Sequence, residues 1–225
     1  MRAPGAFPCG RAVGLGSRRS LARLLAVVLL GTACASRALR FGPASAETSV
    51  AALREWERAT ARAGQAGDEN ILYDAAMTQG LFRAAGTLAV RLRGERVEGT
   101  LAGPFGSPIA TYSDGELRGE KISPVRLPAE ELRAVLAGIW IGPPAEIAGE
   151  NGSEVLLRWS GAFPAEGVFN LDRAELGMLR VQRAEGQLEA RFSGRRDPWP
   201  DRIEIEEKRT GSTLKLKLLS REVLR

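Results

Sequence analysis

Acidic side chains gather at three places in this sequence where their spacing suits a general acid and a general base. The clusters are Glu130 with Glu131, Asp172 with Glu175, and Glu204 with Glu206 and Glu207. The first cluster follows Pro128 in a helical pattern, where negative charge complements the helix dipole. In the last, Glu204 and Glu206 alternate with Ile203 and Ile205, which is typical of the solvent face of a strand. Because each cluster has a structural explanation, we predict that the protein is not an enzyme.

The remaining side chains also offer little chemistry. The chain has no His, so it lacks the usual general base and the commonest metal ligand. Its two Cys, Cys9 and Cys34, lie in or at the edge of the amino-terminal segment, so the rest of the chain has neither a disulfide nor thiol chemistry. We therefore predict no cofactor and no metal site.

The stretch GPFGSP, residues 103–108, raises the question of a phosphate-binding loop. Such a loop needs glycines that lead into the amino terminus of a helix, often with a Lys. Here residues 109–112, IATY, continue as a strand, and the two prolines remove backbone donors that a phosphate would use. The sequence therefore predicts a turn between two strands.

The amino terminus has the layout of an export signal. Residues 1–33 place basic side chains before an apolar run from Leu24 to Leu30, which is too short to span a bilayer permanently. The segment that follows, GTAC, resembles a bacterial lipobox, in which the cysteine, here Cys34, receives a lipid and becomes the mature amino terminus. The alternative is an ordinary cleaved signal with a bystander thiol, for which residues 44–46, ASA, offer a cleavage site.

The formal charge of +5 comes from this same segment. Five of the 32 Lys and Arg lie in residues 1–33, which leaves 27 to balance the 27 Asp and Glu of the chain. A domain without an excess of Lys and Arg has no general attraction for phosphate backbones, so we predict no nucleic-acid partner. Residues 34–47 are small and patternless, as in a flexible tether, and residues 48–225 are long enough for one domain.

Two segments of this domain have helical spacing. Thr48 or Ser49 can cap a helix that runs to about Ala63, with Gly64 placed to stop it. Residues 127–140, LPAEELRAVLAGIW, predict a second helix that Pro128 opens. Its apolar stripe consists of Leu132, Val135, Leu136 and Ile139.

Most of the remaining chain alternates between apolar and polar residues, which predicts strands. The alternation is clear in residues 86–93, 97–101, 155–159, 179–181, 188–192, 203–205 and 214–218. One face of the sheet is then apolar and the other charged, as in an antiparallel sheet with water on one side. We predict a mainly β (α+β) fold, a curved antiparallel sheet or incomplete β-barrel with about two helices covering its concave apolar face. The helices either fill this concavity or leave room for an apolar ligand.

Three segments resemble the outer-membrane lipoprotein localisation factors, the LolA/LolB-like family. Residues 86–119 resemble the family's first strands, with Pro104-Phe105-Gly106-Ser107 at a turn that separates two of them. Residues 127–144 resemble its Leu-rich helix followed by a Gly-Pro step, and residues 200–218 its last hairpin. The resemblance covers about residues 49–220.

The resemblance implies an incomplete β-barrel closed by helices, whose apolar cavity holds acyl chains of lipids or lipoproteins. It further implies an outer-membrane lipoprotein facing the periplasm of a Gram-negative bacterium, anchored through Cys34, with a periplasmic carrier protein as a possible partner. Ala35 is not the aspartate that signals retention in the inner membrane. The expected cavity residues are Leu88, Val90, Leu92, Leu101, Leu132, Leu136, Trp140, Leu157, Trp159, Leu179, Leu188, Phe192, Ile203 and Leu216.

The sequence departs from the family in one place. Members that accept lipoproteins at the outer membrane have a protruding loop with an exposed apolar residue between the first strands. Here residues 95–106 run directly into the turn, so we expect this loop to be absent. Two alternatives therefore stay open. One is a structural or assembly lipoprotein with a filled concavity that binds another protein, and the other is a carboxylate-dependent enzyme acting on envelope polymers.

Overall fold

The computed structural model describes residues 40–64, 68–161, 163–184, 186–196 and 199–224. Phe41–Arg225 form one compact unit. The predicted signal segment and Cys34 lie outside the described residues. Within the described ranges, we find no helix with the length and hydropathy needed to cross a membrane.

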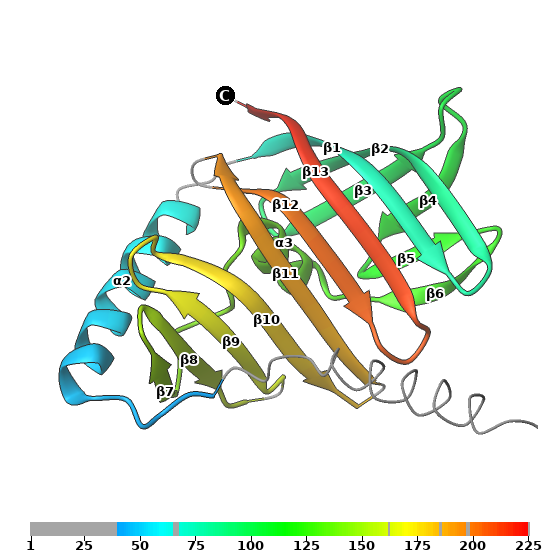
Figure 1. The fold of residues 1–225 in the computed structure, drawn as a ribbon. Coiled ribbons are helices and arrows are strands. Elements are labelled where there is room, and N and C mark those ends of the chain that lie inside the picture. Colours follow the sequence, from blue (N-terminus) through cyan, green and yellow to red (C-terminus); the bar gives the residue numbers. More distant parts are fainter. Residues whose placement is uncertain (1–39, 65–67, 162, 185, 197–198, 225) are drawn as a thin grey trace, which may run out of the picture. The chain divides into compact units, whose positions relative to one another are not determined.

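A 13-stranded antiparallel sheet forms the body of this unit (Figure 1). Its strands are β1 (Glu69–Gln79), β2 (Phe82–Arg93), β3 (Arg96–Ala102), β4 (Pro108–Ser113), β5 (Glu116–Gly119), β6 (Ile122–Arg126), β7 (Glu146–Asn151), β8 (Glu154–Trp159), β9 (Ala165–Asn170), β10 (Glu175–Arg183), β11 (Gly186–Arg196), β12 (Trp199–Glu207) and β13 (Ser212–Val223). The described helices are α2 (Ala46–Gly64) and α3 (Ala129–Ala137). The predicted fold class is confirmed, because the sheet is curved, antiparallel and open and is accompanied by helices.

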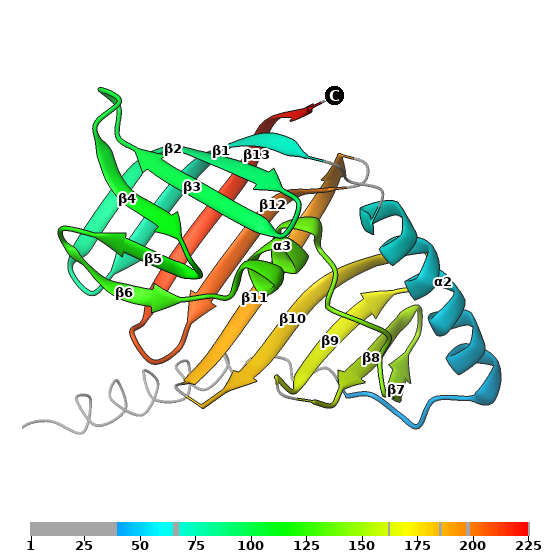
Figure 2. The same ribbon diagram turned by 180° about the vertical axis from the view of Figure 1, so that it is seen from behind.

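The chain enters the sheet in its middle. The strand order is β6-β5-β4-β3-β2-β1-β13-β12-β11-β10-β9-β8-β7. From β1 the chain steps outward to one edge at β6, crosses through α3 to the other edge at β7, and steps back until β13 pairs with β1. Figure 2 shows α3 in front of the sheet, on its concave side. The crossing helix is thereby placed inside the curve that the strands make.

Alternation of side chains explains how one face of the sheet becomes the core. In β1, Ile71, Tyr73 and Met77 are buried, whereas Asp74 and Ala76 between them are exposed. We had named no strand over residues 69–79, yet β1 joins the two ends of the domain, because it pairs with β2 on one side and β13 on the other. The small residues of β1 weaken its alternating hydrophobic pattern, so local propensity for a strand is low. The pairing with the distant strand β13 stabilises β1 instead.

Helix α2 begins earlier than expected. The hydroxyl of Ser45 accepts a hydrogen bond from the backbone of Thr48 at 3.0 Å, and the carbonyl of Ser45 accepts one from the backbone of Ser49 at 3.0 Å. Ser45 is therefore the N-cap, and the prediction of Thr48 or Ser49 was wrong. All three side chains are good caps, so sequence alone did not separate them.

The folded unit also takes in residues that we had assigned to the tether. The backbone of Gly42 donates to the carbonyl of Glu150 and accepts from its amide, both at 2.9 Å. This bridge covers part of the free edge of β7, which would otherwise present unpaired backbone groups. A Cβ on Gly149 would lie 2.6 Å from the Gly42 carbonyl oxygen, so this close approach requires glycine there.

Helix α3 begins after Pro128, as its sequence predicts, and ends at Ala137, within the predicted segment of residues 127–140. Pro128 occupies the N-cap position, and Gly138 is the C-cap with φ of 65°. The amides of Gly138 and Ile139 donate to the carbonyls of Val135 and Ala134, each at 3.0 Å. A Cβ on Gly138 would also lie 2.7 Å from Pro200 of β12, so the helix end and its packing both require glycine.

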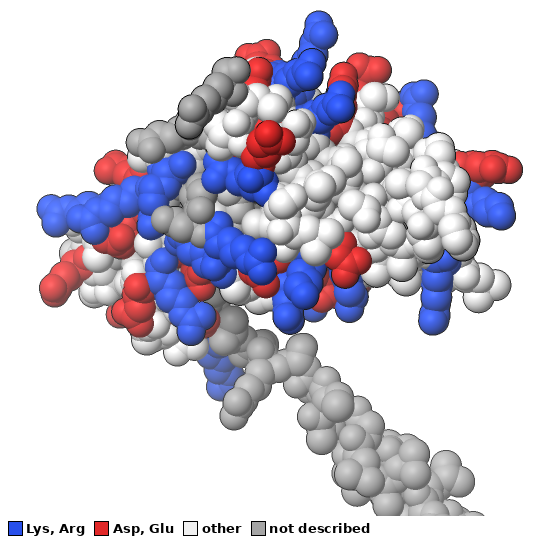
Figure 3. Space-filling view, turned by 90° about the horizontal axis from the view of Figure 1, so that it is seen from above, with Lys and Arg blue, Asp and Glu red and all other residues white. Residues whose placement is uncertain are grey.

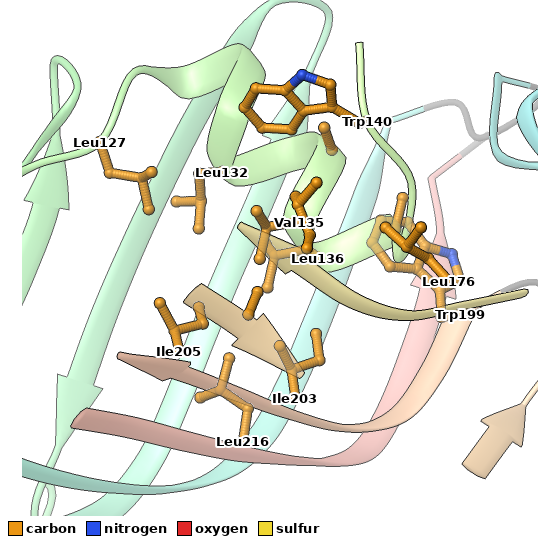
Figure 4. Packing of buried hydrophobic residues seen from close by; sticks show 14 of the residues in the cluster. Leu127, Leu132, Val135, Leu136, Trp140, Leu176, Trp199, Ile203, Ile205 and Leu216 are labelled. Atoms are coloured by element: carbon orange, nitrogen blue, oxygen red, sulfur yellow. The ribbon is translucent and has the colours of Figure 1, made fainter. Parts of the chain in front are cut away.

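The buried face of α3 packs on the middle of the sheet (Figure 4). Leu132, Val135 and Leu136 point from the helix toward Ile205 and Leu216 of β12 and β13. Val135 and Leu136 are fully buried. Burial of this stripe fixes the short helix, since an isolated helix of its length is not stable in water.

Candidate functional site

An apolar cavity lies between α3 and the concave face of the sheet. About 80 Å³ of it is open to the centre of a water-sized sphere, which is room for more than one small group. Its wall is apolar. The lining residues are Met77, Leu88, Val90, Gly99, Leu101, Tyr112, Leu117, Val125, Leu127, Leu132, Leu136, Leu188, Ile205, Glu207, Ser212, Thr213, Leu214 and Leu216.

Half of the predicted cavity residues line this space: Leu88, Val90, Leu101, Leu132, Leu136, Leu188 and Leu216. Several others lie in the packed core beside it: Leu92, Trp140, Leu157, Trp159, Leu179 and Ile203. Phe192 is partly buried and lines a smaller pocket near Gly138. The alternation in the sequence thus found the inward face, but not which part of that face is hollow.

Other lining residues escaped sequence reasoning. Met77 follows the alternation of β1, which we had not identified as a strand. Tyr112 and Leu117 lie on β4 and β5, where short strands carry too few residues for the alternation to stand out. A search for inward positions on the strands flanking GPFGSP would have found Tyr112.

The concave face near α2 is filled instead of hollow. The ring of Trp56 lies 5.1 Å from that of Trp159 and 5.7 Å from that of Phe169, between ring centroids. Both indole N–H groups donate to the carbonyl of Gly142, at 3.3 Å from Trp56 and 3.2 Å from Trp159. The aromatic rings and their shared acceptor leave this region closely packed.

A buried ion pair lies at the amino-terminal end of α3. Glu131 accepts a hydrogen bond from Arg183 of β10, which also donates to the carbonyl of Arg126 at 2.6 Å. Burial raises the pKa of Glu131, and the nearby Arg183 only partly offsets this effect. We had interpreted Glu131 as a charge serving the helix dipole, so its burial against a distant strand is a correction.

Tyr112 connects this region to the cavity. Its hydroxyl donates to the carbonyl of Leu127 at 2.5 Å. Burial, together with the carboxylate of Glu131, raises the pKa of Tyr112 to about 12, so the phenol stays protonated at neutral pH. The tyrosine therefore serves as a neutral wall of the cavity and ties β4 to the segment that leads into α3.

A second, more polar space adjoins the apolar cavity. About 210 Å³ of it is open to the centre of a water-sized sphere. It shares Val125, Leu188 and Glu207 with the lining of the cavity, and its other residues include Arg126, Glu131, Phe163, Arg183, Gln187 and Arg209. We call this space the vestibule. An apolar space thus adjoins one whose lining also includes charged side chains.

The stretch GPFGSP is a turn between β3 and β4, as predicted. The amide of Gly103 donates to the carbonyl of Ser107, and the amide of Gly106 to the carbonyl of Gly103, both at 2.9 Å. Figure 1 shows the connection standing out from the sheet. Phe105 at its tip is 99% exposed, so the turn itself presents an apolar side chain although the longer loop of the family was not expected here. The turn is short, but its strands end early enough to leave it projecting.

Uncharged surface is extensive on the side seen from above in Figure 3. There, residues other than Lys, Arg, Asp and Glu form one broad area, and charged side chains of both signs stand along its margin. Leu81, at the turn between β1 and β2, is fully exposed like Phe105. Apolar side chains are therefore found on turns at the surface as well as inside the cavity.

The acidic side chains of the last cluster each have a structural partner. Glu204 pairs with Lys215 and Glu206 with Lys208 on the outer face of the sheet. Glu207 accepts backbone hydrogen bonds from Arg209 and Thr210, which together with a side-chain bond from Thr210 outweigh burial and lower its pKa. In the described part of the chain, no group of three or more acidic side chains could hold a metal ion.

Among known proteins, the chain is similar only to solved structures. No protein-family model matches the chain, and no curated protein matches it. A LolA superfamily protein from Nitrosomonas europaea is 13% identical with a TM-score of 0.41, over 77% of this chain and 94% of that one. A putative outer membrane lipoprotein-sorting protein domain from Vibrio parahaemolyticus is 11% identical with a TM-score of 0.43, over 76% and 91%.

A third solved structure, a DUF1329 family protein from Desulfovibrio piger, is 12% identical with a TM-score of 0.46, over 77% of this chain and 92% of that one.

Proposed function

We propose that this protein is an envelope lipoprotein that binds the acyl chains of lipids or lipoproteins, for carriage or for insertion into the outer membrane. The observation that supports this most is the apolar cavity under α3, with walls formed by Leu88, Leu101 and Leu136. Each methylene that moves from water into such a wall stabilises a complex by about 0.8 kcal/mol. A chain of several methylenes would therefore bind without any charged contact.

The exposed apolar turns suit a protein that works at a membrane. Phe105 and Leu81 are almost fully exposed on turns of the same sheet. An aromatic side chain on a projecting turn favours the interface of a bilayer, where its ring leaves water. In this proposal, Cys34 supplies the permanent anchor, and Phe105 contacts the bilayer when an acyl chain is transferred. A periplasmic carrier protein would deliver that chain.

Native mass spectrometry of the full chain extracted from membranes tests the proposal. We expect a lipid mass on the segment that contains Cys34 and a second, noncovalent lipid that leaves at higher collision energy. The absence of any bound or bindable acylated ligand would contradict the cavity function. An unmodified chain that begins after Ala46 would contradict the anchor alone.

The same experiment separates the proposal from the alternative of a structural lipoprotein that binds another protein. The closely packed tryptophans under α2 favour that alternative for this half of the concave face. A stoichiometric protein partner without any bound lipid would support it. The cavity under α3 is the reason that we place acyl-chain binding first.

A further inference from the structure

The buried ion pair in the vestibule leaves two polar atoms without a partner. Oε1 of Glu131 and Nε of Arg183 are both buried and have no hydrogen bond within the described residues. The side chain of Glu131 is 1% exposed and that of Arg183 is 15% exposed. Buried polar groups in proteins nearly always have a partner, so an unmet acceptor next to an unmet donor requires an explanation.

The other acid of the vestibule differs in this respect. Glu207 accepts from the amides of Arg209 at 3.0 Å and Thr210 at 2.8 Å, so both of its oxygens are occupied. Arg126 is exposed, and its attraction for an anion is screened by water. Among these residues, the buried atoms without a hydrogen-bond partner belong to the Glu131–Arg183 pair, which lines the vestibule.

We infer that the vestibule is a headgroup site that selects acyl chains ending in a neutral group able both to donate and to accept hydrogen bonds, above all an amide. This inference rests on the proposed acyl-chain function. Both atoms are closed to solvent in this structure, so the ligand would bind as the two side chains turn toward the vestibule. The amide N–H would then donate to Oε1 of Glu131, and its carbonyl would accept from Nε of Arg183. The chain beyond the amide would then lie in the apolar cavity, past Val125 and Leu188, which line both spaces.

Other headgroups fit the pair less well. An ester accepts hydrogen bonds but donates none, so it would leave Glu131 unmet. A free carboxylate would bring a second negative charge beside Glu131, and like charges at short distance repel strongly when they are buried. A hydroxyl donates and accepts through one atom, so it can meet both groups less easily than an amide. The expected order of affinity is decanamide, 1-decanol, methyl decanoate and decanoate.

Titration calorimetry of the full chain with these four ligands, each below its aggregation concentration, tests the inference. We expect decanamide to bind at least tenfold more tightly than decanoate and several-fold more tightly than methyl decanoate. Equal affinities for decanamide and methyl decanoate would overturn the headgroup site and leave acyl-chain binding standing. Tighter binding of decanoate would also overturn it, and would assign the vestibule to Arg126 and Arg209. Failure of all four ligands to bind would overturn the proposed function and this inference together.

A pair of matched variants locates the selectivity. In Glu131→Gln the negative charge is gone, so decanoate should bind more tightly than to the native chain and the tenfold preference should fall to within threefold. A gain of affinity cannot come from a loss of folding. Glu130→Gln removes the neighbouring acid, whose side chain is exposed and does not line the vestibule, and it should keep the preference. An unchanged preference in Glu131→Gln would contradict the role of the pair.

Discussion

The concave face of the sheet has two halves that are packed in different ways. Under α2, Trp56 contacts Trp159 and Phe169, and the two indoles share the carbonyl of Gly142. Under α3, the wall is made of leucines from the helix and from β2, β3, β11 and β13, and it encloses a cavity. Large flat rings with a common polar anchor fix one arrangement, whereas aliphatic side chains around a void have no such anchor.

This difference assigns separate roles to the two halves. We expect the half with the tryptophans to contribute more to stability, because its aromatic rings contact one another and the indole N–H groups of Trp56 and Trp159 both have an acceptor. The half with the leucines is less stabilised by packing, because the side chains that line a void lack van der Waals contacts on the side that faces it. In the proposed function, this half exchanges packing for room to bind an acyl chain.

The largest effect is expected in the filled half. Trp56→Ala removes a side chain that is 2% exposed and leaves both ring contacts unmade, so it should lower the free energy of unfolding by about 3–5 kcal/mol. Urea unfolding followed by circular dichroism measures this. Leu53→Ala, on the exposed side of the same helix, is the control. It should lower the free energy of unfolding by well under half as much. Equal losses would mean that the tryptophan cluster does not hold α2.

Two identical substitutions on one strand contrast the cavity with the core. Leu88 and Leu92 both point inward from β2, but Leu88 lines the cavity and Leu92 does not. Leu92→Phe should overpack the core and cost about 1–3 kcal/mol without changing acyl-chain affinity. Leu88→Phe should instead fill the void, weaken decanamide binding at least tenfold and leave stability nearly unchanged. Calorimetry measures the decanamide affinity of both variants, and urea unfolding measures their stability. Equal effects of the two substitutions on both quantities would contradict the distinction between cavity and core.

Acid should destabilise the sheet through a residue outside both halves. Burial disfavours the charge of Glu189, but hydrogen bonds and charge attraction from Arg180 and Arg191 outweigh it and hold its pKa below the usual range. Since the native state favours the ionised form, this stabilisation is present above the unfolded pKa and is lost as pH falls through the lower native pKa. Glu189→Gln should therefore lower the free energy of unfolding by about 1–2 kcal/mol at pH 7.

The test of this assignment is the difference between the native chain and Glu189→Gln in urea unfolding at pH 7 and at pH 3. The gap should shrink at the lower pH, because the native carboxylate is then partly protonated too. Glu204→Gln, on the exposed face, is the control and should change little at either pH. A gap that stays constant would show that charge is not the cause.

The smallest effect on stability is expected at the projecting turn. Phe105→Ser alters a side chain that packs on nothing, so unfolding should shift by less than about 0.5 kcal/mol, and decanamide should bind as before. Association with phosphatidylethanolamine and phosphatidylglycerol vesicles, measured by flotation, should fall. Unaltered flotation would remove Phe105 from the proposed membrane contact.

Features that depend on neighbouring residues could be predicted from the sequence, whereas features that depend on distant partners could not. The start of α3 at Pro128, the turn at GPFGSP and the inward leucines of β2 each follow from a few neighbouring residues, and all were predicted. The strand β1 and the bridge from Gly42 to Glu150 depend on partners far along the chain, so no short window revealed them. The ion pair of Glu131 with Arg183 is of the same kind, since its members are 52 positions apart in the sequence.

The candidate site illustrates the same limit. Alternation identified residues that face inward, and those near Leu88 and Leu136 do line the cavity. Whether inward residues meet or leave a gap depends on how α3 and the tryptophans fill the curve of the sheet, and this is a property of the assembled volume. Leu157 and Leu179 have the same pattern in sequence and are fully buried in packed core.

The most direct test of the account is to photolabel the full chain with a decanamide that carries a diazirine at the end of its chain. If the leucine-lined half holds the acyl chain, labelled peptides should contain Leu132 and Leu136 of α3 and Leu88 or Leu101 of the facing strands. Excess decanamide should abolish the labelling. Labels on Trp159 or Phe169, or spread over exposed surface without competition, would contradict the assignment of binding to the cavity under α3.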